Sequence, residues 1–234
     1  MLGQVGGAWR ALVAGCTALP RAGLTGGVPL KLEAFVGSVV RLAWAKANGC
    51  PWVVKTCAYI AWGGHLEVLR WAREHGCAWD SMTCANAAAG GHLEVLRWAR
   101  EHGCPWDVFT TSCAAADGQL ETLKWLRQHD CPWDGRTCSE AATGGHLEVL
   151  IWAREHGCQW EMANVRLHAI RGGHLNVVQW LLEHGCDWDS DACRIAASGG
   201  HLKVLQWAWE QDYPQHKDSI CFRAAEVRRC RLTL

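Results

Sequence analysis

Hydrophobic and polar positions along this 234-residue chain follow a pattern that returns every 27 residues, with a single step of 28. The passage GGHLEVLRWAREHGC occupies residues 63–77 and is repeated without a change at residues 90–104. A third copy, at residues 144–158, differs only at Ile151. The sequence therefore predicts an array of similar units rather than one irregular core.

Each passage has the periodicity of an amphipathic helix. In the second copy, Leu93, Leu96 and Ala99 fall on one side of a helix, and Val95 and Trp98 lie beside them. The charged residues between them face water. A unit of this size cannot bury such an apolar side alone, so neighbouring units must stack on one another.

A second, alanine-rich helix is expected before each of these passages. In the unit that holds the second copy, Asp80 or Ser81 is placed to cap this short helix, and Gly90 and Gly91 then turn the chain back. Gly103 stands where a left-handed glycine would end the longer helix. Each unit is thus predicted to be an antiparallel pair of helices.

This unit resembles the ankyrin repeat. Residues 87–107, AAAGGHLEVLRWAREHGCPWD, align with that family's Ala-Ala, Gly-His, apolar second helix and closing Gly, and Pro29-Leu30 stand where it has Thr-Pro-Leu. The resemblance covers about residues 28–226. It implies an all-α, ankyrin-like helical repeat solenoid of about seven stacked helix pairs. Ankyrin units usually have about 33 residues, so shortened loops should replace the family's projecting hairpins.

Outside the repeats we expect an irregular N-terminal segment, residues 1–27, and a C-terminal tail, residues 227–234, flanking a repeat domain at 28–226. The first acid is Glu33, and this acid-poor start leaves open an organelle transit segment. We otherwise expect a monomer in the cytoplasm or nucleus. The formal net charge is zero, which favours neither nucleic acid nor a membrane as partner.

The fourteen cysteines permit a metal or redox interpretation, because some are spaced seven apart with a histidine nearby. Zinc sites usually have tighter pairs. Thr111 and Arg166 also replace the second cysteine in two units, so we expect packing roles and no metal or cofactor. The pairs considered are Cys77/Cys84, Cys131/Cys138 and Cys186/Cys193, with His75, His129 and His184.

Histidine and tryptophan also recur once or twice in each unit. A histidine begins the second helix in five units, and we expect it to hydrogen-bond to backbone there or in a neighbouring unit. The tryptophan series at 27-residue spacing is predicted to form core. No phosphate loop, nucleophile elbow or H-E-x-x-H motif is present, which argues against an enzyme.

Residues that change from unit to unit remain available for a specific function. Several lie on or beside the short helices, which line the concave surface in the family that the repeats resemble. We expect this face to bind another protein, with a hot spot near Tyr59, Trp62 and Phe109; Tyr59 and Trp62 could instead cap the interior. A thiol- or metal-responsive stack and a structural spacer are the alternatives. The predicted partner-binding residues are Lys55, Tyr59, Trp62, Met82, Asn86, Phe109, Arg136, Glu140, His168, Arg171, Asp191 and Arg194.

Overall fold

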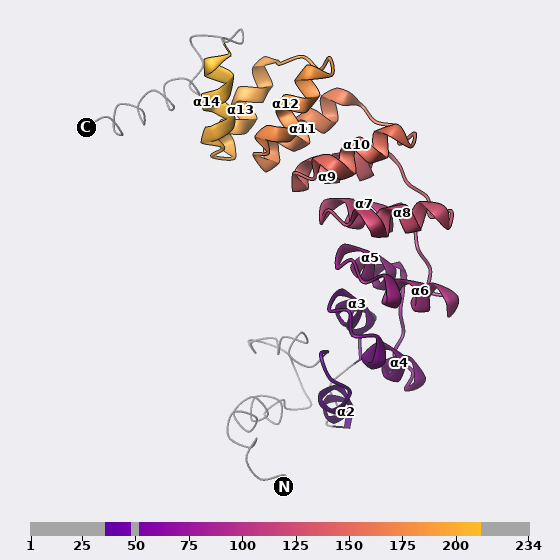
Figure 1. Cartoon of the computed structure of the whole chain (residues 1–234). Helices are drawn as coiled ribbons and strands as arrows, with labels where there is room; N and C mark the ends of the chain where they lie inside the picture. Colours follow the sequence, from indigo (N-terminus) through magenta and orange to yellow (C-terminus); the bar gives the residue numbers. More distant parts are fainter. Residues whose placement is uncertain (1–35, 48–51, 212–234) are drawn as a thin grey trace, which may run out of the picture. The chain divides into compact units, whose positions relative to one another are not determined.

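The computed structural model describes residues 36–47 and 52–211, and throughout these residues the only regular elements are helices (Figure 1). The described helices fall into two compact units, one ending at Pro105 and the other beginning at Trp106. The predicted N-terminal segment, the Pro29-Leu30 helix start and the C-terminal tail lie outside the described residues.

In its described part, the first unit contains two complete helix pairs and the second helix of an earlier one. The first helices α3 and α5 pack against each other, and each packs against the second helix of its own repeat. α2 packs against α4. The elements are α2 (Val39–Ala47), α3 (Lys55–Trp62), α4 (Leu66–Glu74), α5 (Ser81–Ala89) and α6 (Leu93–Glu101).

Up to residue 211, the last one described, the second unit contains four complete helix pairs. Its first helices α7, α9, α11 and α13 pack in succession, each against the next in the series. The elements are α7 (Val108–Ala116), α8 (Leu120–Gln128), α9 (Gly135–Gly144), α10 (Leu147–Glu155), α11 (Met162–Gly172), α12 (Leu175–Glu183), α13 (Ser190–Ser198) and α14 (Leu202–Glu210).

This arrangement confirms the predicted fold class, an all-α, ankyrin-like stack of helix pairs. No strand occurs in the described ranges, and residues 75–80 and 129–134 are short connections. The expected replacement of hairpins by short loops is therefore confirmed there. None of the described helices is long and apolar enough to cross a membrane.

Aspartates and glycines set the helix ends as the sequence indicates. Asp80, and not Ser81, is the N-cap of α5, and its carboxylate accepts a hydrogen bond from the Met82 N–H at 3.0 Å. Asp107 and Asp134 cap α7 and α9 in the same way. Gly103, after α6, has φ of 80°, the left-handed conformation predicted for it.

The core consists of small and aliphatic side chains rather than indoles. Val95, Leu96 and Ala99 are buried as predicted, whereas Leu93 is only half-buried. The prediction that the tryptophan series forms the core is wrong for most members, because Trp98 and its counterparts are half-buried and Trp188 alone is buried among those described. They lie at the edge of each stack, where the amphipathic indole contacts both neighbours and water.

Histidine side chains connect successive repeats. His92 Nε2 lies 2.9 Å from the carbonyl oxygen of Trp62 in the preceding repeat. In the second unit, His174 reaches the Thr143 carbonyl at 2.8 Å and His201 reaches that of Arg171 at 2.6 Å. These contacts use the carbonyls at first-helix ends. Of the two roles expected for these histidines, the contact with a neighbouring repeat is confirmed at these positions.

Candidate functional site

The predicted partner-binding residues all lie on first helices, and we call the surface that they form in each unit the first-helix face. In the first unit it is largely apolar. Trp62, the last residue of α3, is 58% exposed and Met82 of α5 is 41% exposed. Lys55 is also exposed, whereas Tyr59 is half-buried.

Asn86 completes this face in the first unit, but part of its side chain already hydrogen-bonds to its own helix. Its side-chain nitrogen donates to the Met82 carbonyl oxygen at 2.9 Å. The amide oxygen is left to accept another hydrogen bond. The face thus offers apolar area beside a polar group, which is the composition of many protein-binding surfaces.

The first-helix face of the second unit is mostly charged. Phe109 of α7 is 45% exposed and gives this face its large apolar side chain. Arg136, Arg171 and Arg194 on the following first helices are exposed. Glu140 and His168 are half-buried, whereas Asp191 is exposed.

Two of these arginines have local carboxylate partners. Arg194 Nη2 lies 3.1 Å from Asp191 Oδ1, one turn earlier in α13, and Arg136 Nε lies 3.7 Å from Asp134 Oδ2. Exposed pairs of this kind contribute little to stability and exchange partners readily. Both guanidinium groups therefore remain able to bind a carboxylate of another molecule.

His168 is the most constrained member of this face. Its Nδ1 lies 2.9 Å from the hydroxyl of Thr143 on the preceding first helix. Burial, followed by the positive charge of Arg171, lowers the pKa of His168, and the charge of Glu140 opposes this shift. The imidazole is thus neutral at pH 7. The pairing with Thr143 was not predicted, because the two residues are 25 apart.

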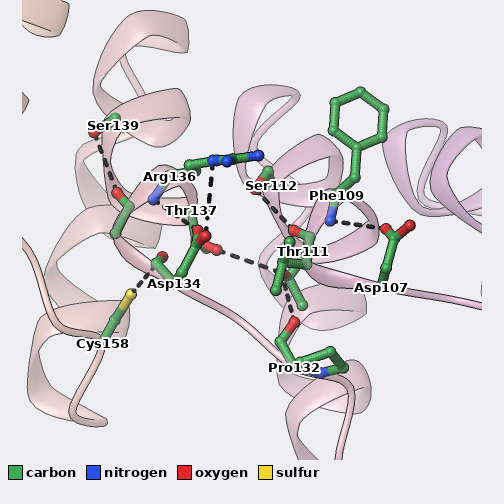
Figure 2. A network of polar contacts seen from close by, with 12 residues as sticks. Asp107, Phe109, Thr111, Ser112, Pro132, Asp134, Arg136, Thr137, Ser139 and Cys158 are labelled. Carbon is green, nitrogen blue, oxygen red and sulfur yellow. Dashed lines mark hydrogen bonds and ion pairs between the residues drawn. The ribbon is translucent and has the colours of Figure 1, made fainter.

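A buried polar network fixes the neighbouring helices α7 and α9 (Figure 2). The Thr111 hydroxyl lies 2.9 Å from the Val108 carbonyl oxygen and 3.1 Å from that of Pro132, and it accepts a hydrogen bond from Thr137 at 3.4 Å. Figure 2 shows Phe109 pointing away from this network. The network holds the backbone of the face in place and leaves Phe109 available to a partner.

The cysteines meet in pairs that differ from those considered in the sequence. Cys57 hydrogen-bonds to Cys77 and Cys138 to Cys158, each pair joining a first helix to the third residue after the second helix of the same repeat. These hydrogen bonds, and then burial, raise the pKa of Cys57 and of Cys138. The ten cysteines in the described ranges are not joined by disulfides, and all are buried or half-buried.

The sulfurs also bind backbone within their own repeat. Cys104 Sγ lies 3.3 Å from the Asp80 carbonyl oxygen, and Cys158 Sγ lies 3.2 Å from that of Asp134. Each cysteine thereby connects the end of the second helix to the N-cap of the first. Over the part of the chain that is described, no three His, Cys, Asp or Glu side chains come together as metal ligands would.

Comparison with known proteins supports the predicted resemblance. Residues 167–208, which hold α12, α13 and parts of α11 and α14, match a family model described as ankyrin repeats in many copies. The predicted resemblance to the ankyrin repeat is thus confirmed over these residues. No curated protein matches the chain.

Proposed function

We propose that this ankyrin-repeat chain is a non-catalytic interaction module that binds another protein through its first-helix faces. Ankyrin repeats generally mediate protein–protein contacts. The observation that carries the proposal is where the exposed apolar side chains lie. Trp62, Met82 and Phe109 are exposed at positions that vary between repeats, whereas the repeated leucines Leu69, Leu96, Leu123 and Leu150 are fully buried. Stability of the stack does not require large apolar groups at such exposed positions.

The two faces suggest different contributions to binding. In the first unit, Trp62 and Met82 offer apolar area of the kind that hot spots use. In the second unit, Arg136 and Arg171 are suited to carboxylates and Phe109 to an apolar group. We expect partners that combine aliphatic or aromatic residues with acidic ones.

Binding without chemistry is proposed because no group on these faces has the surroundings of a nucleophile or general base. His168 is neutral, but its Nδ1 is engaged by Thr143. Cys113, half-buried on α7, has its pKa raised to about 11 by burial and by the charges of Asp117, Glu140 and Asp107. A thiol with such a pKa is a poor nucleophile at neutral pH.

Affinity enrichment from cell extract, followed by direct binding of the purified partner, tests the proposal. One full-length variant carries Phe109→Ala, Arg136→Ala, Glu140→Ala and Arg171→Ala in the second unit. A second carries Trp62→Ala and Met82→Ala in the first. The matched control replaces the exposed second-helix residues Glu148, Leu202 and Lys203 with Ala.

The proposal predicts that a protein enriched by the wild type is lost with at least one face variant and kept by the control. Folding of each variant is checked by thermal unfolding. Equal enrichment by wild type and both face variants would contradict the proposal and favour a structural spacer.

A thiol-responsive stack is the second candidate, and the Cys57–Cys77 and Cys138–Cys158 contacts favour it. Thiol counting and zinc analysis of purified protein distinguish it. Fourteen free thiols and no bound zinc, unchanged after peroxide treatment, would exclude this candidate.

A further inference from the structure

The second helices carry a repeated aromatic stack. In five of the described second helices the tryptophan stacks on the histidine four residues later, with ring centroids 4.4 Å apart for Trp98 and His102 and 4.2 Å apart for Trp180 and His184. At Trp98 and at Trp180 an arginine of the preceding repeat also lies over the indole, although the two arginines stand at different positions of their second helices. Arg70 Cζ is 5.9 Å from the Trp98 ring centroid, and Arg154 Cζ is 5.6 Å from that of Trp180. Such cation–π contacts cover part of the ring.

This stack is interrupted at Trp152. Its histidine is present, with a centroid distance of 4.2 Å to His156. The residue that corresponds to Arg70 is Lys124, however, and its ammonium lies 2.7 Å from Glu121 Oε1. A hollow of about 340 Å³ lies beside the indole, lined by Lys124, Arg127, Gln128, Trp152 and His156.

A second departure from the repeat occurs at the same place. Gln128 ends α8, whereas the corresponding residues Glu74, Glu101, Glu155, Glu183 and Glu210 are all acidic. The hollow is therefore lined by two cations and no carboxylate. At the equivalent place in the first unit, Arg70 lies over the Trp98 ring and Glu74 would repel an anion.

The cations of the hollow are available to a ligand. One Arg127 nitrogen donates to the Cys131 carbonyl oxygen at 2.7 Å, and the guanidinium lies over the Trp133 ring with Cζ 4.4 Å from its centroid. The remaining N–H groups at the edge of the guanidinium can still donate to an anion. Glu121, the partner of Lys124, is 76% exposed, so an incoming anion competes with a weak, solvated ion pair. His156 Nδ1 lies 2.8 Å from the Trp152 carbonyl oxygen, which leaves Nε2 for other contacts.

We propose that this hollow binds a small aryl anion, an aromatic ring that bears a phosphate or carboxylate. The ring packs against the Trp152 indole, and the anionic group lies between Lys124 and Arg127. The hollow is at the small end of the range of about 300–1,000 Å³ for ligand sites, which suits one ring and one charged group. The site lies on second helices and does not depend on the first-helix faces.

Phenyl phosphate, titrated into the ¹⁵N-labelled full chain, tests the proposal by NMR. The Trp152 indole N–H signal is assigned with Trp152→Phe. We expect saturable shifts centred on Trp152, Lys124 and Arg127, and at least about tenfold weaker binding of benzyl alcohol and of inorganic phosphate, since each lacks one of the two contacts. A phosphotyrosine peptide, compared with phenyl phosphate, distinguishes a partner side chain from a free small molecule as the source.

Two variants make the test specific. Lys124→Arg keeps the charge but places a guanidinium where Arg70 lies over Trp98, and should weaken phenyl phosphate binding about tenfold by closing the hollow. Arg70→Lys with Glu74→Gln gives the first unit the same residues and should create a second site at Trp98. Unchanged affinity in Lys124→Arg, or equal binding of inorganic phosphate, which would mean an adventitious ion only, overturns the proposal.

Discussion

Arg166 of α11 and Asp189, the N-cap of α13, form an ion pair that joins two successive repeats. The Arg166 side chain is only 4% exposed, and its Nε has no hydrogen-bond partner. The other Asp189 oxygen accepts from the Ala192 N–H at 3.0 Å. Asp189 thus neutralises a buried charge and caps a helix with the same carboxylate.

Asp189→Asn should destabilise the second unit by about 1–3 kcal/mol, because the cap survives while the buried guanidinium loses its counter-charge. Asp107→Asn is the control, since Asp107 caps α7 and pairs with no arginine within the described ranges. Urea unfolding measures both. Arg166→Cys, which restores the cysteine found at Cys138, should cost less than Asp189→Asn. Equal effects of the two asparagine variants would show that the ion pair adds nothing.

Much of the fold follows from the sequence because neighbouring residues encode it. The period that buries Val95 and Leu96, and the Asp80 cap, depend on residues within one or two turns. The ion pair of Arg166 depends on a residue 23 positions away, and Cys57 meets Cys77 across two helices. Such contacts arise from packing, which the periodicity does not specify. The same limit applies to the hollow at Trp152, because the side-chain conformation of Lys124 decides whether the Trp152 indole is covered.

Substituting Gly145 and Gly157 with Ala distinguishes the cost of backbone strain from the cost of a clash between repeats. Both have positive φ, 77° and 81°, but a Cβ at Gly145 would lie 2.3 Å from His174 Nδ1, whereas one at Gly157 would meet nothing within 4 Å. Each Ala substitution should cost about 1–2 kcal/mol through the left-handed backbone. Gly145→Ala should cost more, because His174 must leave the Thr143 carbonyl. Thermal unfolding measures the loss of stability in each variant. Equal losses in Gly145→Ala and Gly157→Ala would contradict this account.

Cys113 should react slowly with iodoacetamide at neutral pH. Burial, followed by nearby carboxylates, raises its pKa to about 11, so only about one thousandth of the thiol is ionised at pH 8. The labelling rate should rise about tenfold per pH unit up to that pKa. Mass spectrometry of the peptide that contains Cys113, labelled between pH 7 and pH 10, measures this. A rate that levels off near pH 8.5, as for an ordinary thiol, would contradict the prediction.

His168 should make the second unit sensitive to mild acid. Its pKa is lowered in the folded protein, chiefly by burial. The folded state therefore binds the proton less well than the unfolded state does. Stability should fall as the pH drops below about 6.5, the unfolded value, and stop falling below the folded pKa. His168→Gln should be less sensitive over this window, as measured by urea unfolding at several pH values, and the same pH dependence in wild type and variant would exclude His168 as its source.

Trp62 and Trp98 lie in the same unit, and we expect Trp62 to act in partner binding and Trp98 in packing. Trp62 is 58% exposed, so Trp62→Ala should change the free energy of unfolding by less than about 1 kcal/mol. Trp98 is half-buried and contacts Trp79, His102 and Arg70, so Trp98→Ala should cost about 2–4 kcal/mol. Below its melting transition the Trp98→Ala variant should bind a partner protein as tightly as the wild type does, whereas Trp62→Ala should weaken that binding. If Trp62→Ala instead lowers stability as much as Trp98→Ala does, Trp62 is a packing residue, and the apolar area offered by the first unit is smaller than the exposed side chain suggests.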